Sequence, residues 1–216
     1  MSSIVNSFLL VYAGLFPIVD PVGGAPIFLG LTRRLDRKRR QSVAWHVAVN
    51  SFILLLGSLV VGSYVLEFFG ISLPVVRIAG GLVVATFAWK LLHQNAELQD
   101  HSDAGAAGAE DRPIDAFYPL TMPLTVGPGS ISVAITLGSQ HPRGPVGLAD
   151  LALVGGALAG LLAVAITIFL CYRYAERITS ALGESGTNVL VRMSAFILLC
   201  IGIQIMWNGA STLLHP

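Results

Sequence analysis

Two apolar stretches of this chain are interrupted by prolines and glycines in similar ways. The first interruption lies at residues 17–26 (PIVDPVGGAP) and the second at 119–130 (PLTMPLTVGPGS). Breaking a helix at membrane depth is costly, because the freed N–H and C=O groups find no water there. Such breaks persist only where the backbone is buried in protein or lines a polar cavity. Two breaks at corresponding places in two halves of a chain therefore predict a substrate or ion site near the bilayer midplane.

The composition indicates an integral membrane protein. Of the 216 residues, 54% are hydrophobic and 12% are charged, and the mean hydropathy is +0.74. Soluble domains have about 25% charged residues. The stretches long enough to cross a hydrocarbon core of about 30 Å lie at 4–32, 43–66, 73–92, 116–139, 151–172 and 189–214. We therefore expect an all-α, polytopic membrane protein with six transmembrane helices, of which the first and the fourth are broken.

The two halves of the chain align with each other. Shifts of 106 and 115 residues bring together Pro17 with Pro123, Gly23 with Gly129, and Arg77 with Arg192. Three spans in each half put the second copy upside down, so the sequence predicts two inverted three-helix repeats related by an axis in the membrane plane. The expected parts of this single membrane domain are a first repeat over 1–92, a linker over 93–115 and a second repeat over 116–216.

The distribution of basic residues predicts the orientation. The loop at 33–40 holds six of the 13 lysines and arginines, and short cytoplasmic loops are enriched in these residues. We therefore expect this loop to be cytoplasmic and both termini to lie outside. The segment 93–115 then falls on the cytoplasmic side. It is rich in small and acidic residues and has no apolar periodicity, as is typical of a flexible connection.

Asp20 is the only acidic residue inside an expected span. A charge at the centre of a membrane helix costs at least about 2.5–3.5 kcal/mol, which points to a function. Asp20 is a candidate site for a proton or cation, or for the ammonium group of a substrate. The alternative is that its side chain caps the half-helix that follows. The two roles are compatible.

The other candidate residues also lie at the breaks. Glycines allow a ligand to approach the backbone closely, and the free N–H groups at the start of a half-helix suit a carboxylate. The alternatives are that the glycines only permit close helix packing and that the hydroxyls bond their own helix. With Asp20, the candidates for substrate binding are Gly23, Gly24, Thr125, Gly127, Gly129 and Ser130. Arg77 and Arg192 are candidates for coupling or for a structural role, and the alternative for them is contact with lipid phosphates.

Several other functions lack support in the sequence. It contains no Walker loop, no dinucleotide-binding turn, no HExxH motif and no paired Cys/His ligand set, so we expect no enzyme, no metal site and no cofactor beyond a coupling proton or sodium ion. No basic surface interleaved with aromatic residues suggests nucleic acid. The expected partners are the lipid bilayer and a small-molecule substrate. A GxxxG pattern at 156–160 indicates a helix crossing within or between chains, which leaves a homo-oligomer open.

Three segments resemble one known family. Residues 20–26 (DPVGGAP), 77–81 (RIAGG) and 127–130 (GPGS), the last preceded by Pro123, are similar to motifs of the MarC family of bacterial inner-membrane proteins. The resemblance covers nearly the whole chain. It implies an inner-membrane location, an architecture related to the LysE-type exporters and, from members described as neutral amino acid transporters, a neutral amino acid as substrate. The family usually has Asn where this chain has Gly24, which leaves the substrate preference open.

These observations together predict a secondary transporter of a small zwitterionic solute. Its carboxylate would meet the N–H groups near Gly23 and Gly24 or those of 127–130, and its ammonium group or a coupling proton would meet Asp20. An uncoupled channel or facilitator, and a membrane scaffold or regulator without transport, are the alternatives. The direction of transport and the coupling ion are left open.

Overall fold

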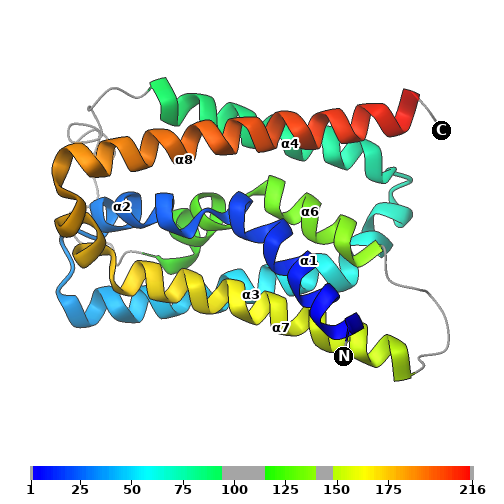
Figure 1. Cartoon of the computed structure of the whole chain (residues 1–216), viewed down its shortest axis with the longest axis horizontal. Helices are drawn as coiled ribbons and strands as arrows, with labels where there is room; N and C mark the ends of the chain where they lie inside the picture. The colour runs from blue at the N-terminus through cyan, green and yellow to red at the C-terminus, as the bar shows by residue number, and fades with distance from the viewer. Residues whose placement is uncertain (1, 94–114, 140–147, 215–216) are drawn as a thin grey trace.

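The structure, a computed structural model, describes residues 2–93, 115–139 and 148–214. Within these ranges it consists of eight helices and no strand, so the described part of the chain is all-α, as expected (Figure 1). Nearly all of the expected linker over 93–115 lies outside the described residues. In chain order the helices are α1 (Ser2–Val19), α2 (Pro21–Leu31), α3 (Arg37–Phe68), α4 (Leu73–His93), the π-helix η2 (Ala116–Thr125), α6 (Pro128–Ser139), α7 (Leu148–Arg173) and α8 (Ala175–Leu214).

Four helices, α3, α4, α7 and α8, are each long and apolar enough to cross a membrane. Two further candidates are bent pairs that qualify only together: α1 with α2, bent by 41°, and η2 with α6, bent by 70°. The described residues therefore hold four candidate spans, or six if each bent pair counts as one. The breaks expected in the first and fourth stretches are present. The inverted relation between the two halves stays a prediction.

Helices α4 and α8 form a closely packed pair along one side of the molecule (Figure 1). Glycines allow this contact. A Cβ added to Gly81 would lie 2.6 Å from the carbonyl oxygen of Gly202, and one added to Gly202 would lie 2.7 Å from the backbone nitrogen of Ala85. Close backbone approach at small residues is a common way for helices to associate in membranes. Larger side chains at Gly81 or Gly202 would force the pair apart.

The remaining helices share a separate apolar core. It includes Leu15 of α1, Phe28 of α2, Leu55 of α3 and Leu161 of α7. Val84 and Ala88 of α4 and Leu198 of α8 form a second, smaller cluster, whereas Ala175 at the start of α8 belongs to the main core. The described part of the chain thus has a main body and the α4–α8 pair, which are joined by contacts of α4 with α6 and of α8 with α2.

The GxxxG pattern of α7 crosses α1 within the chain. A Cβ on Gly156 would overlap the carbonyl oxygen of Ile4, and one on Gly160 would lie 3.0 Å from that of Phe8. This contact accounts for both glycines without a second copy. The pattern is therefore no evidence for a homo-oligomer.

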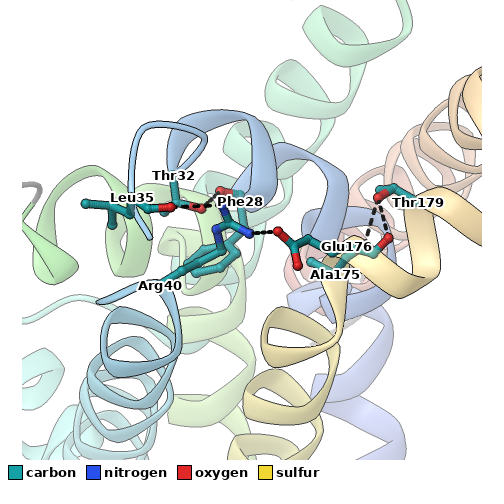
Figure 2. A network of polar contacts seen from close by, with 7 residues as sticks. All are labelled: Phe28, Thr32, Leu35, Arg40, Ala175, Glu176 and Thr179. Carbon is teal, nitrogen blue, oxygen red and sulfur yellow. Dashed lines mark hydrogen bonds and ion pairs between the residues drawn. The ribbon is translucent and has the colours of Figure 1, made fainter. Parts of the chain in front are cut away.

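The two ends of the molecule differ. The start of α1 and the end of α8 lie toward one end, and the turn between α2 and α3 lies at the other (Figure 1). At that second end the guanidinium group of Arg40 on α3 pairs with the carboxylate of Glu176 on α8, and Arg40 also donates to the carbonyl oxygen of Leu35 at 3.1 Å (Figure 2). The Arg40 side chain is only 12% exposed. This ion pair ties the two halves together beside the basic loop.

Candidate functional site

A cavity of about 80 Å³ lies between the two breaks and the α4–α8 pair. About 10–15 Å³ of such volume holds one water molecule, so the cavity has room for several waters or for a small solute. One wall is formed by residues of α4 and α8, among them Val83, Val84, Phe87, Val191, Ser194 and Leu198. The other wall is formed by the ends of the half-helices.

All seven residues that the sequence singled out for substrate binding line this one cavity. The break between α1 and α2 contributes Asp20, Gly23 and Gly24. The break between η2 and α6 contributes Thr125, Gly127, Gly129 and Ser130. The two breaks are about 100 residues apart in the chain. They lie together because both face the α4–α8 pair. Their role in binding stays a prediction.

At the first break the carboxylate of Asp20 caps α2. Asp20 has left-handed backbone angles, φ 42° and ψ 61°, and its side chain accepts the N–H of Gly23 at 3.0 Å. Its carbonyl oxygen accepts the N–H of Gly24 at 2.9 Å, and the hydroxyl of Ser194 on α8 donates to its carboxylate. Asp20 is therefore both a cap and part of the cavity wall. The N–H groups of Gly23 and Gly24 are occupied and cannot bind a substrate carboxylate.

The second break contains no acid and uses hydroxyl groups instead. The hydroxyl of Thr125 donates to the carbonyl oxygen of Leu120 at 2.7 Å, and that of Ser130 donates to the carbonyl oxygen of Gly127 at 2.9 Å. The first N–H groups of a helix have no partner within it. No hydrogen bond among the described residues takes the N–H of Gly129 or Ser130. The start of α6 thus offers free donors and positive partial charge beside the cavity.

The glycines at the breaks also allow close packing. A Cβ on Gly23 would lie 2.6 Å from the side chain of Ser194, and one on Gly129 would overlap the side chain of Val84. The first break therefore lies directly against α8 and the second against α4. At these two positions the absence of a side chain allows both close packing and access to the cavity.

The two arginines that the sequence singled out do not line the cavity. Arg77 is half-buried, and its Nε donates to the hydroxyl of Thr136 on α6 at 3.4 Å. Arg192 is exposed. The structure thus brings neither of them to the site, and it favours a structural role for Arg77.

Two residues at the site were not singled out from the sequence. Ser194 bonds Asp20, and Tyr172 of α7 bonds Thr125, with 2.8 Å between their hydroxyl oxygens. Ser194 lies two residues after Arg192, inside the repeated segment, so the alignment of the halves contained a signal for it. Tyr172 closes an apolar stretch, and no local pattern distinguishes it there.

Comparison with known proteins places the chain in a family. The family described as "MarC family integral membrane protein" matches residues 5–214. The inner membrane protein MarC of Salmonella typhimurium is 31% identical over 199 residues, covering 90% of each chain. The membrane protein YvbG of Bacillus subtilis is 31% identical over 94% of each chain. A membrane protein of Methanocaldococcus jannaschii is 30% identical over 94% of this chain and 95% of its own.

No solved structure matches the chain, so the family rests on sequence alone. Its model covers almost all of the residues described above, including both breaks and the α4–α8 pair. The relatives are matched over nearly their full lengths. The chain belongs to the MarC family of integral membrane proteins.

Proposed function

We propose that this chain is a secondary transporter of a small zwitterionic solute, with a neutral amino acid of the size of glycine or alanine as the best candidate. The observation that carries the proposal is the polarity of the cavity. The carboxylate of Asp20 lies at one break, and the free N–H groups of Gly129 and Ser130 lie at the other. A zwitterion presents an ammonium group and a carboxylate a few bonds apart, and so matches both.

Each break then has its own task. The N–H groups at the start of α6 bind the solute carboxylate, because they are unpaired and carry the positive end of the helix dipole. Asp20 binds the ammonium group, or carries a coupling proton or sodium ion. Binding of the carboxylate near Gly23 and Gly24 is not part of the proposal, because their N–H groups are occupied.

The division of the core favours a transporter over a fixed channel. The cavity lies between the main body and the α4–α8 pair, so a movement of one unit against the other would change access to it. The packing of the halves is also mirrored, since α2 packs on α8 as α6 packs on α4. This mirrored packing supports the inverted repeat, in which alternating access comes from rocking one unit against the other.

We further propose that the protein resides in the bacterial inner membrane, as the names of its MarC relatives state for those proteins. The lipid bilayer and the solute are its partners, and it carries its solute without chemical change. Both termini would lie outside. Asp36→Cys, in the basic loop, tests this orientation: it should resist an impermeant thiol reagent in intact cells and react after permeabilisation. Reaction in intact cells would reverse the orientation.

The function is tested with purified protein in proteoliposomes. Uptake of labelled amino acids is measured under a proton gradient, under a sodium gradient and with neither. Accumulation against a concentration gradient supports the secondary transporter. Saturable flux that never exceeds equilibration identifies a facilitator. Absence of any flux across the panel leaves the scaffold.

A further inference from the structure

A fully buried tyrosine packs against residues that line the cavity. Tyr172 is 1% exposed and does not itself line the cavity. Its ring stacks on that of Phe28 of α2, with 4.4 Å between the ring centroids and 14° between the planes. Its hydroxyl oxygen lies 2.8 Å from that of Thr125, which does line the cavity. One side chain of α7 thus contacts elements from both breaks.

The direction of the hydrogen bond between these hydroxyls follows from a third group. Thr125 Oγ1 lies 2.7 Å from the carbonyl oxygen of Leu120, and a carbonyl oxygen only accepts. The single proton of Thr125 is therefore committed to Leu120, so Tyr172 donates to Thr125. A hydroxyl oxygen accepts two hydrogen bonds, so one lone pair of Thr125 remains. Thr125, which lines the cavity, thus has one acceptor position left and no donor.

Gly24 is a necessary part of this arrangement. A Cβ added to Gly24 would lie 2.9 Å from the hydroxyl oxygen of Tyr172, but 3.6 and 3.7 Å from its nearest ring carbons. The last two distances are ordinary contacts, so only the hydroxyl is in conflict. The ring cannot easily turn away, because it is stacked on Phe28. A side chain at position 24 would therefore separate the hydroxyl of Tyr172 from Thr125.

We propose that Tyr172 is a positioning residue whose hydrogen bond holds in place the hydroxyl of Thr125, an acceptor because its own proton goes to Leu120, and that Tyr172 and Gly24 thereby select solutes with an ammonium group. An ammonium group is a donor only. It satisfies an acceptor and a carboxylate together, whereas a solute without it leaves both unpaired, which is unfavourable. This inference rests on the proposed function and adds a specificity determinant to it.

The experiment compares uptake of labelled alanine and labelled propionate, which has the same carboxylate and carbon chain but no ammonium group. Tyr172→Phe removes the hydroxyl and keeps the stacked ring. The loss of one neutral hydrogen bond should raise the KM for alanine by about three- to tenfold, with kcat little changed. The preference for alanine over propionate should fall by a similar factor. Gly24→Ala should have the same effect.

The double variant tests whether the two residues act through one contact. When the hydroxyl is absent, the methyl group added at position 24 has no clash, so adding Gly24→Ala to Tyr172→Phe should cause little further change. Such non-additivity is expected only of residues that share an interaction. If the effects of the two changes multiply, Gly24 and Tyr172 act separately and the proposed arrangement is wrong.

The chain offers a matched control for each change. Tyr12 makes a similar contact, with its hydroxyl 3.2 Å from that of Thr167, which donates to the carbonyl oxygen of Ala163 at 2.7 Å. Neither Tyr12 nor Thr167 lines the cavity. Gly30 lies on α2, like Gly24, and has open space where a Cβ would be. Tyr12→Phe and Gly30→Ala should leave the preference for alanine unchanged.

The outcomes separate this inference from the proposed function. A wild-type protein that moves no amino acid contradicts both. If the wild-type protein moves alanine but Tyr172→Phe and Gly24→Ala keep its ratio of alanine to propionate uptake, the inference is wrong. The proposed transporter function is then still supported. If Tyr172→Phe does not fold, Gly24→Ala alone decides the matter, since its effect on the ratio is expected to be the same.

Discussion

The two broken spans satisfy their backbone groups in opposite ways. At the break between α1 and α2, the carboxylate of Asp20 takes the N–H of Gly23, so an acceptor side chain serves a backbone donor. At the break between η2 and α6, the hydroxyls of Thr125 and Ser130 serve backbone carbonyls, and the amides at the start of α6 stay open. The first break is left with negative charge and acceptor atoms. The second is left with donors and positive partial charge.

For the proposed transport of a zwitterion, this difference matters more than the likeness of the two breaks. Two breaks of the first kind would face each other with two carboxylates, and two of the second kind with two sets of N–H groups. Neither pair would suit a solute that carries both charges. The repeated prolines and glycines place the breaks together, and the departures from the repeat give the cavity its polarity.

The largest expected effect comes from locking the second break to α4. A Cβ on Gly129 would lie 3.4 Å from that of Val84, close to the 3.5–4.5 Å typical of a disulfide. At the first break, the Cβ atoms of positions 23 and 194 would be only 2.6 Å apart, so a disulfide suits the second break alone. Val84→Cys with Gly129→Cys, made after replacing Cys171 and Cys200, should lose nearly all transport on oxidation.

Reduction of that disulfide should restore transport, and the reduced double variant is its own control. The physical reason is that alternating access requires the α4–α8 pair to move against the half-helices. Oxidised protein that transports at the rate of the reduced protein, with the cross-link verified by mass spectrometry, would show that α4 and α6 move as one unit.

The next largest effect is expected from the charge at the first break. Asp20→Asn keeps the size and the capping oxygen, and Asn caps helices about as well as Asp. Asn also tolerates the left-handed backbone that this position requires. If Asp20 carries the coupling ion, accumulation against a gradient should be lost while exchange at equal pH persists.

Comparing Asp20→Ala with Asp20→Asn separates the role of the cap from that of the charge. Asp20→Ala removes both and places Ala in a left-handed backbone, so the free energy of unfolding should fall by about 2 kcal/mol, whereas Asp20→Asn should leave it nearly unchanged. An Asn variant that still concentrates its solute, with unchanged pH dependence, would limit Asp20 to its structural role.

The sequence could predict which residues of the breaks meet at this cavity because its signals are local. Prolines, glycines and an acid inside apolar stretches mark a break wherever the rest of the chain lies, so the seven candidates could be named without a structure. Ser194 and Tyr172 reach the site only through the packing of α8 and α7 against the breaks. Tyr172 is 47 residues from Thr125 in the chain, and no sequence pattern near it predicts that contact.

The arginines show how repetition can mislead. A shared position along two spans says nothing about direction around the helix axis. On α8 the cavity is lined by Val191, Ser194, Ala195 and Leu198, which follow the helical period, and Arg192 falls outside this stripe. On α4, Arg77 shares the face of Val84 but lies seven residues earlier, about 10 Å along the axis.

A smaller effect is expected from Ser194, the residue by which α8 contacts the first break. Its hydroxyl donates to the carboxylate of Asp20, and a hydrogen bond to a charged group is stronger than a neutral one. Ser194→Ala should therefore raise the KM for the solute by about tenfold. Ser132→Ala is the matched control, because the hydroxyl of Ser132 donates to the carbonyl oxygen of Gly129 in its own helix at 2.8 Å. Equal effects of the two changes would contradict a special role for Ser194.

The smallest effect is expected from Ser130→Ala, which asks whether the second break binds the solute through its amides or its hydroxyls. The hydroxyl of Ser130 donates to the carbonyl oxygen of Gly127 at 2.9 Å, so its proton is not free for a carboxylate. Losing that bond destabilises the empty and the solute-bound protein equally, so its effect largely cancels in KM. Because the N–H of residue 130 remains, KM in the proteoliposome assay should change by less than about twofold. A tenfold rise would assign the carboxylate to the hydroxyl and remove the contrast between a break that offers acceptors and one that offers amide donors.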